Sequence, residues 1–217
     1  MLYIVATPIG NLADITFRAV EILKKADLIA CEDTRHTKIL LDHYAIKTPT
    51  TSFFQHNRFT KGDYLLKLLK DGKNIALVSD AGTPGVLDPG YNLINLAVAN
   101  AIPMTFIPGP VALINALVLS GKPAHKFIFE GFLPNKPISR LNRLKELARL
   151  DYTVIFYESC HRILATLVDI ETAWPGKEIA VARELTKKFE EVIRAKPETI
   201  IVHLKTHSCK GEFVVII

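Results

Sequence analysis

The sequence predicts an α/β protein built from two α/β domains. Short apolar runs alternate with amphipathic stretches along its 217 residues, a pattern typical of βαβ units around a largely parallel sheet. The pattern starts again after GKPAHK (121–126), which predicts an N-terminal domain over 1–121 and a C-terminal domain over 122–217. Loops rich in glycine and proline directly follow several of the apolar runs, as they do at the ligand-binding edge of open α/β sheets.

In the N-terminal half, the apolar runs that predict strands are 2–6, 27–31, 74–79 and 103–107. Apolar residues recur at helical spacing over 15–26, 64–73, 93–101 and 111–121. Thr16 carries a hydroxyl that suits the N-cap of the first of these helices. Gly72 and Gly121 are placed to end the second and fourth, because glycine adopts the left-handed conformation that often follows a helix.

In the C-terminal half, predicted strands are 127–133, 153–157, 178–183 and 211–217, and residues 189–195 alternate between apolar and polar. Predicted helices are 138–150 and 162–170, the first of them rich in basic residues. No internal repeat or low-complexity segment interrupts this order.

Composition restricts the class of protein. The three cysteines are an odd number without the spacing of metal ligands, which indicates reduced thiols in a cytosolic protein and no metal requirement. The first residues, MLYIVATPIG, have no charged leader and indicate a first strand rather than a signal peptide. No apolar segment approaches membrane-spanning length. A formal charge of +5 is compatible with a polyanionic partner.

Four loops are candidates for binding a ligand: 6–14, 31–37, 79–90 and 107–112. Three of them combine glycine and proline directly after a predicted strand, and such loops present a fixed surface of backbone groups. An ordinary tight turn is the alternative for each loop taken alone. None matches G-x-G-x-x-G or a Walker A loop, which disfavours a dinucleotide or nucleoside triphosphate, and the absence of G-x-S-x-G disfavours a typical α/β-hydrolase.

Seven segments together resemble the ribosomal RNA small subunit methyltransferase I family, which has the tetrapyrrole-methylase fold. They are TPIGNLADIT, CEDTRHT, SDAGTPGVLDPG, FEGFLP, FYESCHR, ARELTKKFEE and KGEFV, spread from about Leu2 to Ile217. The resemblance implies 2′-O-methylation of a cytidine ribose in small-subunit (16S) ribosomal RNA, with S-adenosylmethionine as the methyl donor. It also implies a cytoplasmic homodimer that holds the donor in a cleft between its two domains.

The resemblance also implies which residues line the donor. They are Pro8, Ile9, Ala81, Gly82, Thr83, Val86, Val111, Ala112, Glu158, Glu184 and Leu185. The sequence departs from the family pattern at Ala6, where proline is expected, and at Leu87 and Val111, where small polar residues are common.

The segment CEDTRHT offers the groups that a methyl transfer to a ribose hydroxyl requires. Such a hydroxyl is a poor nucleophile at neutral pH, so a nearby acceptor for its proton assists the reaction. Asp33 or Glu32 is the candidate acceptor or its orienting group, and Arg35 is a candidate to hold an RNA phosphate. The alternative is a salt-bridged turn in which Arg35 pairs with its own neighbouring carboxylates.

Further residues are candidates for RNA contact. His36 lies in CEDTRHT, and His56 lies in FFQHNR beside aromatic residues that suit unpaired bases. Arg140 and Arg143 are three positions apart on a predicted helix, so both can contact one stretch of RNA backbone. Leu144 and Leu147, on the next turn, look like apolar anchors. A solvated helix face is the alternative.

In FYESCHR, Glu158 and Arg162 have the spacing of an ion pair within a helix, and His161 is either a base or a structural group. Two other functions stay open on the sequence: methylation of a small tetrapyrrole-like acceptor, and RNA binding without catalysis.

Overall fold

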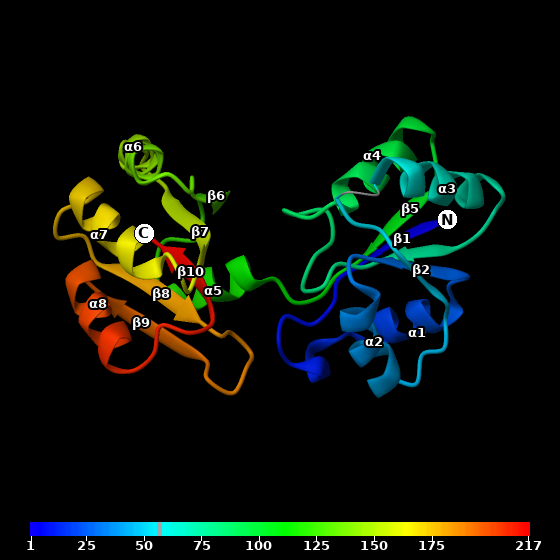
Figure 1. Ribbon diagram of the computed structural model, residues 1–217, viewed down its shortest axis with the longest axis horizontal. Helices are drawn as coiled ribbons and strands as arrows, with labels where there is room; N and C mark the ends of the chain where they lie inside the picture. Colours follow the sequence, from blue (N-terminus) through cyan, green and yellow to red (C-terminus); the bar gives the residue numbers. More distant parts are fainter. Residues whose placement is uncertain (56–57) are drawn as a thin grey trace. The chain divides into compact units, whose positions relative to one another are not determined.

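A computed structural model of the chain describes residues 1–55 and 58–217 (Figure 1). The chain divides into two compact units, Met1–Val111 and Ala112–Ile217. We predicted that the second domain begins at Lys122, but it begins ten residues earlier, at Ala112. The reason is the apolar helix α5 (Ala112–Ser120), which buries Leu113, Ala116 and Leu117 and packs on strands of the second sheet.

The first unit contains a fully parallel sheet with the strand order β3-β2-β4-β1-β5. Its strands are β1 (Leu2–Val5), β2 (Leu28–Cys31), β3 (Thr50–Ser52), β4 (Ile75–Leu77) and β5 (Met104–Ile107). Its helices are the short 3₁₀ helix η1 (Leu12–Asp14), α1 (Phe17–Lys25), α2 (Thr34–His43), α3 (Arg58–Lys70) and α4 (Gly90–Ala99). The Thr16 hydroxyl accepts a hydrogen bond from the Ala19 N–H at 3.1 Å, which confirms the predicted N-cap of α1.

Helices cover both faces of this sheet because its strands are apolar on both sides. Ile29 and Cys31 belong to the core under α1 and α2, whereas Ala30, between them in β2, belongs to the core under α3 and α4. Figure 1 shows the two helix pairs on opposite faces of the sheet. The period of two along each strand therefore builds two hydrophobic layers in one unit.

The second unit contains a mixed sheet with the strand order β6-β7-β10-β8-β9. Its strands are β6 (Phe127–Phe132), β7 (Thr153–Ser159), β8 (Ile179–Arg183), β9 (Glu191–Ala195) and β10 (Glu212–Ile216). Besides α5, its helices are α6 (Pro137–Leu147), α7 (Ile163–Ala173) and α8 (Pro197–Thr206). Leu144, Leu147, Phe156, Leu167 and Phe213 are among its core residues.

Our expectation of a largely parallel sheet is wrong for this second unit. Only β6 and β7 pair in parallel, while β10 runs antiparallel to both of its neighbours and β8 runs antiparallel to β9. The connection from β8 to β9 contains no helix, and parallel neighbours need a long crossover that is usually helical.

Every helix in the described part of the chain is too short or too polar to cross a membrane.

Candidate functional site

Four loops of the first unit meet at one edge of its sheet. They follow β1, β2, β4 and β5, which are neighbours in the order β2-β4-β1-β5, and parallel strands all end at the same edge. Backbone hydrogen bonds join the loops after β1 and β4: the Thr7 N–H donates to the Gly82 carbonyl at 2.9 Å, and the Gly82 N–H donates to the Thr7 carbonyl at 3.1 Å. The Ala6 N–H donates to the Ile107 carbonyl at 3.1 Å, a bond that proline in this position could not form.

Gly82 lies where three of these loops come together. Its φ of +75° is in the left-handed region that glycine adopts at little cost. A Cβ atom at this position would lie 3.2 Å from Ile9 Cγ2 and 3.7 Å from the Pro110 carbonyl oxygen. No side chain fits here without moving a neighbour, and Gly82 is itself buried with its N–H and carbonyl both bonded to Thr7.

The rest of the loop after β4 is braced by Asp88. The Asp88 carboxylate accepts hydrogen bonds from the Gly85 N–H at 2.9 and 3.0 Å and from the Gly90 N–H at 2.7 Å. Burial raises the pKa of Asp88, although the backbone bonds from Gly85, Gly90 and Val86 oppose that change. With Asp88 held inside, the side chains of Ala81, Val86 and Leu87 are exposed.

A cavity of about 240 Å³ lies within the first unit, beside this loop cluster. It brings together Pro8 and His36, two of the residues that the sequence analysis selected. It is lined by the loop after β1, the first turns of α2 and the start of the loop after β4: Thr7, Pro8, Gly10, Leu12, His36, Thr37, Ile39, Leu40, Ser79 and Asp80.

Asp33 has a structural role at the start of α2. Its Oδ1 accepts the Arg35 backbone N–H at 2.8 Å, and its two carboxylate oxygens accept Arg35 Nε at 3.1 Å and Nη2 at 2.7 Å. These hydrogen bonds from Arg35 lower the pKa of Asp33 to about 2. A carboxylate that holds its charge so firmly is a poor proton acceptor, so the salt-bridged turn that we considered as the alternative is the one present.

Glu32, in contrast, has the properties of a base. Burial, followed by the negative charges of Asp80 and Asp88, raises the pKa of its carboxyl. Asp80 is held near this loop because its Oδ1 accepts the Asp33 N–H at 3.1 Å. A raised pKa makes a carboxylate a better proton acceptor near neutral pH, so Glu32 is the stronger of the two catalytic candidates.

In the second unit, the Glu158 carboxylate forms all of its observed hydrogen bonds with residues of the same unit. Its side chain is 0% exposed, and its Oε2 accepts Thr166 Oγ1 at 2.7 Å and Arg162 Nη2 at 3.1 Å, while Oε1 accepts the Ser159 N–H at 2.8 Å. The predicted pair with Arg162 is therefore present. The oxygens of the Glu158 side chain have partners and lie away from solvent, so the predicted donor contact of Glu158 stays a prediction for its backbone.

Glu184 and Leu185 lie in a tight turn after β8. Glu184 has a φ of +51° and Thr186 a φ of +66°, which is strained backbone for side-chain-bearing residues. Glu184 Oε1 accepts Lys187 Nζ at 2.9 Å and the Glu212 N–H at 3.0 Å. Although burial opposes the change, these bonds lower the pKa of Glu184. The Leu185 side chain is buried, so only the backbone of this turn is available to a ligand at Leu185.

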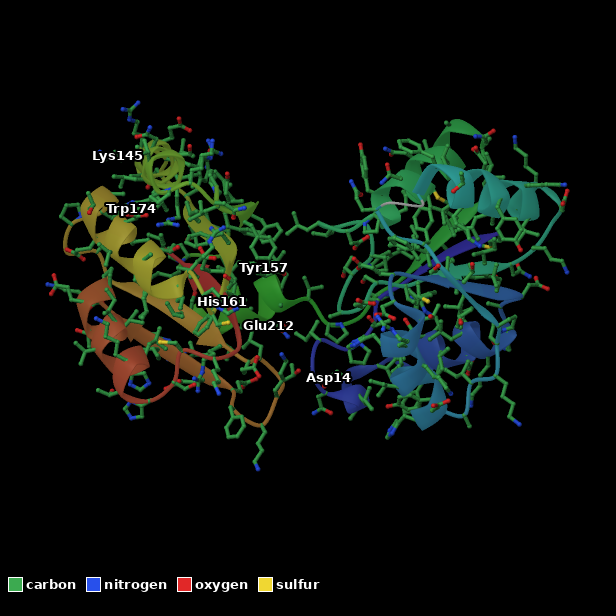
Figure 2. All side chains as sticks on the ribbon, in the orientation of Figure 1. Asp14, Lys145, Tyr157, His161, Trp174 and Glu212 are labelled. Carbon is green, nitrogen blue, oxygen red and sulfur yellow. The ribbon has the colours of Figure 1, made fainter. Side chains whose placement is uncertain are left out.

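The remaining predicted donor residues are divided between the units. Thr83 is half-buried in the loop after β4, Val111 is the last residue of the first unit, and Ala112 begins α5 of the second. His161 is exposed just before α7, and Figure 2 shows it near Glu212, at the edge where β7 ends and β10 begins. His56 lies outside the described residues.

The predicted RNA contact by Arg140 is wrong. Arg140 is 4% exposed, and its Nε donates to Asp169 Oδ2 of α7 at 2.6 Å. Arg143 donates two hydrogen bonds to Glu130 of β6, at 2.7 and 2.8 Å, and one to Glu146 at 2.8 Å, and these carboxylates raise its pKa. Acids from β6 and α7 thus neutralise both arginines, whereas Leu144 and Leu147 are buried as expected.

Replacing Arg140 by methionine should lower the free energy of unfolding by about 3 kcal/mol, because the Asp169 carboxylate would stay largely buried without its partner. Urea unfolding followed by circular dichroism measures the change. Arg149→Met is the matched control, since Arg149 is exposed after the end of α6. Equal unfolding midpoints for the two variants would mean that the ion pair adds nothing to stability.

Comparisons with known proteins agree on one family. The family model of tetrapyrrole (corrin/porphyrin) methylases matches residues 1–201. A ribosomal RNA small subunit methyltransferase I of Synechocystis is 50% identical over 219 residues, covering 100% of this chain and 78% of the relative. The protein of the same name from Thermotoga maritima is 45% identical over 216 residues, covering 100% of this chain and 97% of the relative.

Solved structures show the same fold at low identity. The uroporphyrin-III C-methyltransferase of Thermus thermophilus, solved in complex with S-adenosylhomocysteine, has a TM-score of 0.67 at 16% identity, with 99% of this chain and 96% of that chain covered. A diphthine synthase has a TM-score of 0.73 at 12% identity, with 100% and 88% covered.

Proposed function

Because the chain belongs to the ribosomal RNA small subunit methyltransferase I family, within the tetrapyrrole methylase fold, we propose that it methylates small-subunit ribosomal RNA at the 2′-oxygen of a cytidine. Its methyl donor is S-adenosylmethionine, as in the rest of this family. The family assignment supports ribosomal RNA as the acceptor. The cytidine and the 2′-oxygen are our own more specific proposal.

The geometry of Gly82 carries the proposal for the donor site. Gly82 is fixed by both backbone bonds to Thr7 and is crowded by Ile9, so that a larger residue there would displace the loop that carries Ala81, Thr83 and Val86. Exposed Ala81 and Val86 lie in the same loop and provide apolar surface. These residues fit a donor that is held by backbone hydrogen bonds and small apolar contacts, and the glycine leaves room for its close approach. In the second unit, the backbone of the Glu184–Thr186 turn is the candidate for donor contact.

The bound donor supplies a methyl group already activated by its sulfonium charge, so the chain must align the acceptor and remove a proton. We assign proton removal from the ribose hydroxyl to the Glu32 carboxylate. The Asp33–Arg35 pair fixes the start of α2 next to Glu32 and so orients it. The side chain of Arg35 is 90% exposed despite this pair, which supports its proposed contact with an RNA phosphate. His36 lines the adjoining cavity and is proposed to contact the same RNA.

We also propose a cytoplasmic homodimer. Exposed Ile114, Val118 and Leu119 on α5 support the dimer. The terminal strand β10 lies inside its sheet between β7 and β8, so it has no free edge that could pair with a second copy.

Two measurements test the proposed function. Isothermal titration calorimetry should show that the chain binds S-adenosylmethionine. Tritium from the labelled methyl group should then pass to small ribosomal subunits, or to their RNA, taken from a strain that lacks the modification. Donor binding without transfer would indicate a non-catalytic relative. Transfer to a small tetrapyrrole instead of RNA would show that RNA is not the methyl acceptor.

A further inference from the structure

A second cavity of about 240 Å³ lies within the second unit. It is at the edge of the sheet where β6, β7 and β8 begin and β10 ends. Glu158, Glu184 and Glu212 lie at the opposite edge, where β7 and β8 end and β10 begins. Figure 2 shows Trp174, which lines the cavity, far from Glu212 within this unit. The cavity is therefore separate from the residues of this unit that were considered for donor binding.

The wall of this cavity is strongly basic. Lys122, His125, Lys126 and Lys177 line it, and Asp151 is the one acidic residue in the lining, whereas the whole chain has 27 lysines and arginines to 22 acids. Burial and then the positive charge of Lys177 lower the pKa of Lys122, against the effect of the Glu178 carboxylate. Cations that crowd one another in this way favour binding of an anion.

The lysines of the cavity differ in how they are held. Lys122 Nζ donates to the Glu178 carbonyl oxygen at 2.5 Å and is fixed by that bond. The ammonium groups of Lys126 and Lys177 are on exposed residues, and in the described part of the chain neither forms a hydrogen bond or an ion pair with a carboxylate. These two cations are consequently free to contact a ligand.

Aromatic side chains lie among these cations. Trp174 follows the last residue of α7 and packs partly against the core of the unit, which fixes its ring. Tyr152 is 45% exposed just before β7. A partly buried aromatic ring beside exposed cations matches the chemistry of a nucleotide, since the base stacks on the ring and the phosphate pairs with the ammonium groups.

We propose that this cavity binds a single-stranded segment of the RNA substrate, with a base on Trp174 and phosphates on Lys126 and Lys177. The identity of the ligand rests on the proposed function. The same nucleotide chemistry is offered by an RNA strand and by a free nucleotide. The strand is favoured because two separate free lysines flank the cavity, enough for more than one phosphate.

Trp174 allows a direct test, because it is the single tryptophan of the chain. Its fluorescence is measured during titration with a short single-stranded RNA from the small subunit, with the same RNA in a duplex, and with adenosine monophosphate. We expect the single strand to quench Trp174 at the lowest concentration. Quenching by adenosine monophosphate at the same concentration as by the single strand would overturn the assignment to an RNA strand.

Paired lysine variants test the charges. Lys126→Ala with Lys177→Ala should weaken binding of the single strand roughly tenfold at low salt and flatten the logarithmic salt dependence by about 1.4, the value for two phosphate contacts. Lys196→Ala with Lys205→Ala removes the same charge from exposed positions around α8 and should change binding little. The affinity for S-adenosylmethionine should stay unchanged in both.

The inference is overturned if saturating RNA leaves Trp174 fluorescence unchanged, or if the two double variants lose equal affinity. These results are distinct from failure of the proposed function. Quenching by RNA without methyl transfer would defeat the proposed function and leave the RNA site in place. Methyl transfer to RNA without any change in Trp174 fluorescence would support the proposed function and defeat the RNA site at this cavity.

Discussion

Replacing Gly82 by valine should abolish measurable S-adenosylmethionine binding while the chain stays folded. A β-branched side chain at a φ of +75° is strained, and its Cβ would press on Ile9 Cγ2 at 3.2 Å. The loop must then move, and the paired backbone bonds to Thr7 move with it. If the displaced loop can no longer form two hydrogen bonds to the donor, the affinity should fall by roughly a hundredfold.

The matched control for this variant is Gly72→Val in the same unit. Gly72 has a similar φ of +83°, but a Cβ there would meet nothing within 4 Å. Both variants should therefore lose about 1–3 kcal/mol of stability through backbone strain, and only Gly82→Val should lose the donor. Calorimetry measures binding, and circular dichroism checks the fold. Unchanged donor affinity in folded Gly82→Val protein would remove this loop from the site.

Replacing Glu32 by glutamine should lower kcat for RNA methylation by about 10²- to 10⁴-fold, the usual contribution of a general base. Glutamine has nearly the same shape but does not accept a proton, so donor affinity should change little. Asp33→Asn is the control on the neighbouring residue. Asparagine keeps the N-cap of α2, and Asp33 only helps to orient Glu32 without accepting the proton, so the kcat of this variant should fall far less. Equal losses in the two variants would argue against Glu32 as the base.

The pH dependence of the methylation rate gives a second test of Glu32 as the base. Glu32 accepts a proton only when ionised, so the rate should fall as the pH falls through the raised pKa of its carboxyl. Asp80→Asn removes one of the negative charges that raise this pKa but keeps an oxygen for the Asp33 N–H. The acidic limb of the rate profile should then move to lower pH. A limb that stays in place in the Asp80 variant would point to another titrating group.

Most elements of the fold could be predicted from the sequence because apolar periodicity is a local property. Strands β1, β2, β4 and β5 of the first unit and the cap at Thr16 are examples. The sequence analysis missed β3, α2 and α8. β3 has only the polar residues Thr50, Thr51 and Ser52, so no apolar run marks it. Signals for the two helices were present, in Asp33 as the N-cap of α2 and Pro197 at the first turn of α8.

The site was harder to predict because its charges are set by residues distant in sequence. Arg140 looked like a phosphate ligand until Asp169, 29 positions later, was found beside it. Glu32 and Asp33 were equal candidates on the sequence, and the hydrogen bonds of Arg35 separate them. The basic cavity at Trp174 combines four segments of the second unit, and no single stretch of sequence indicates it.

The position of the transferred methyl group tests the central claim most directly. Alkali cleaves RNA through attack of each ribose 2′-oxygen on the adjacent phosphate, so a methylated 2′-oxygen leaves one linkage intact. After transfer of a tritiated methyl group to small-subunit RNA, alkaline hydrolysis should yield the label in a dinucleotide that carries cytidine on its 5′ side. Label recovered in mononucleotides, as from a methylated base, would contradict 2′-O-methylation, and RNA without label would contradict the acceptor itself.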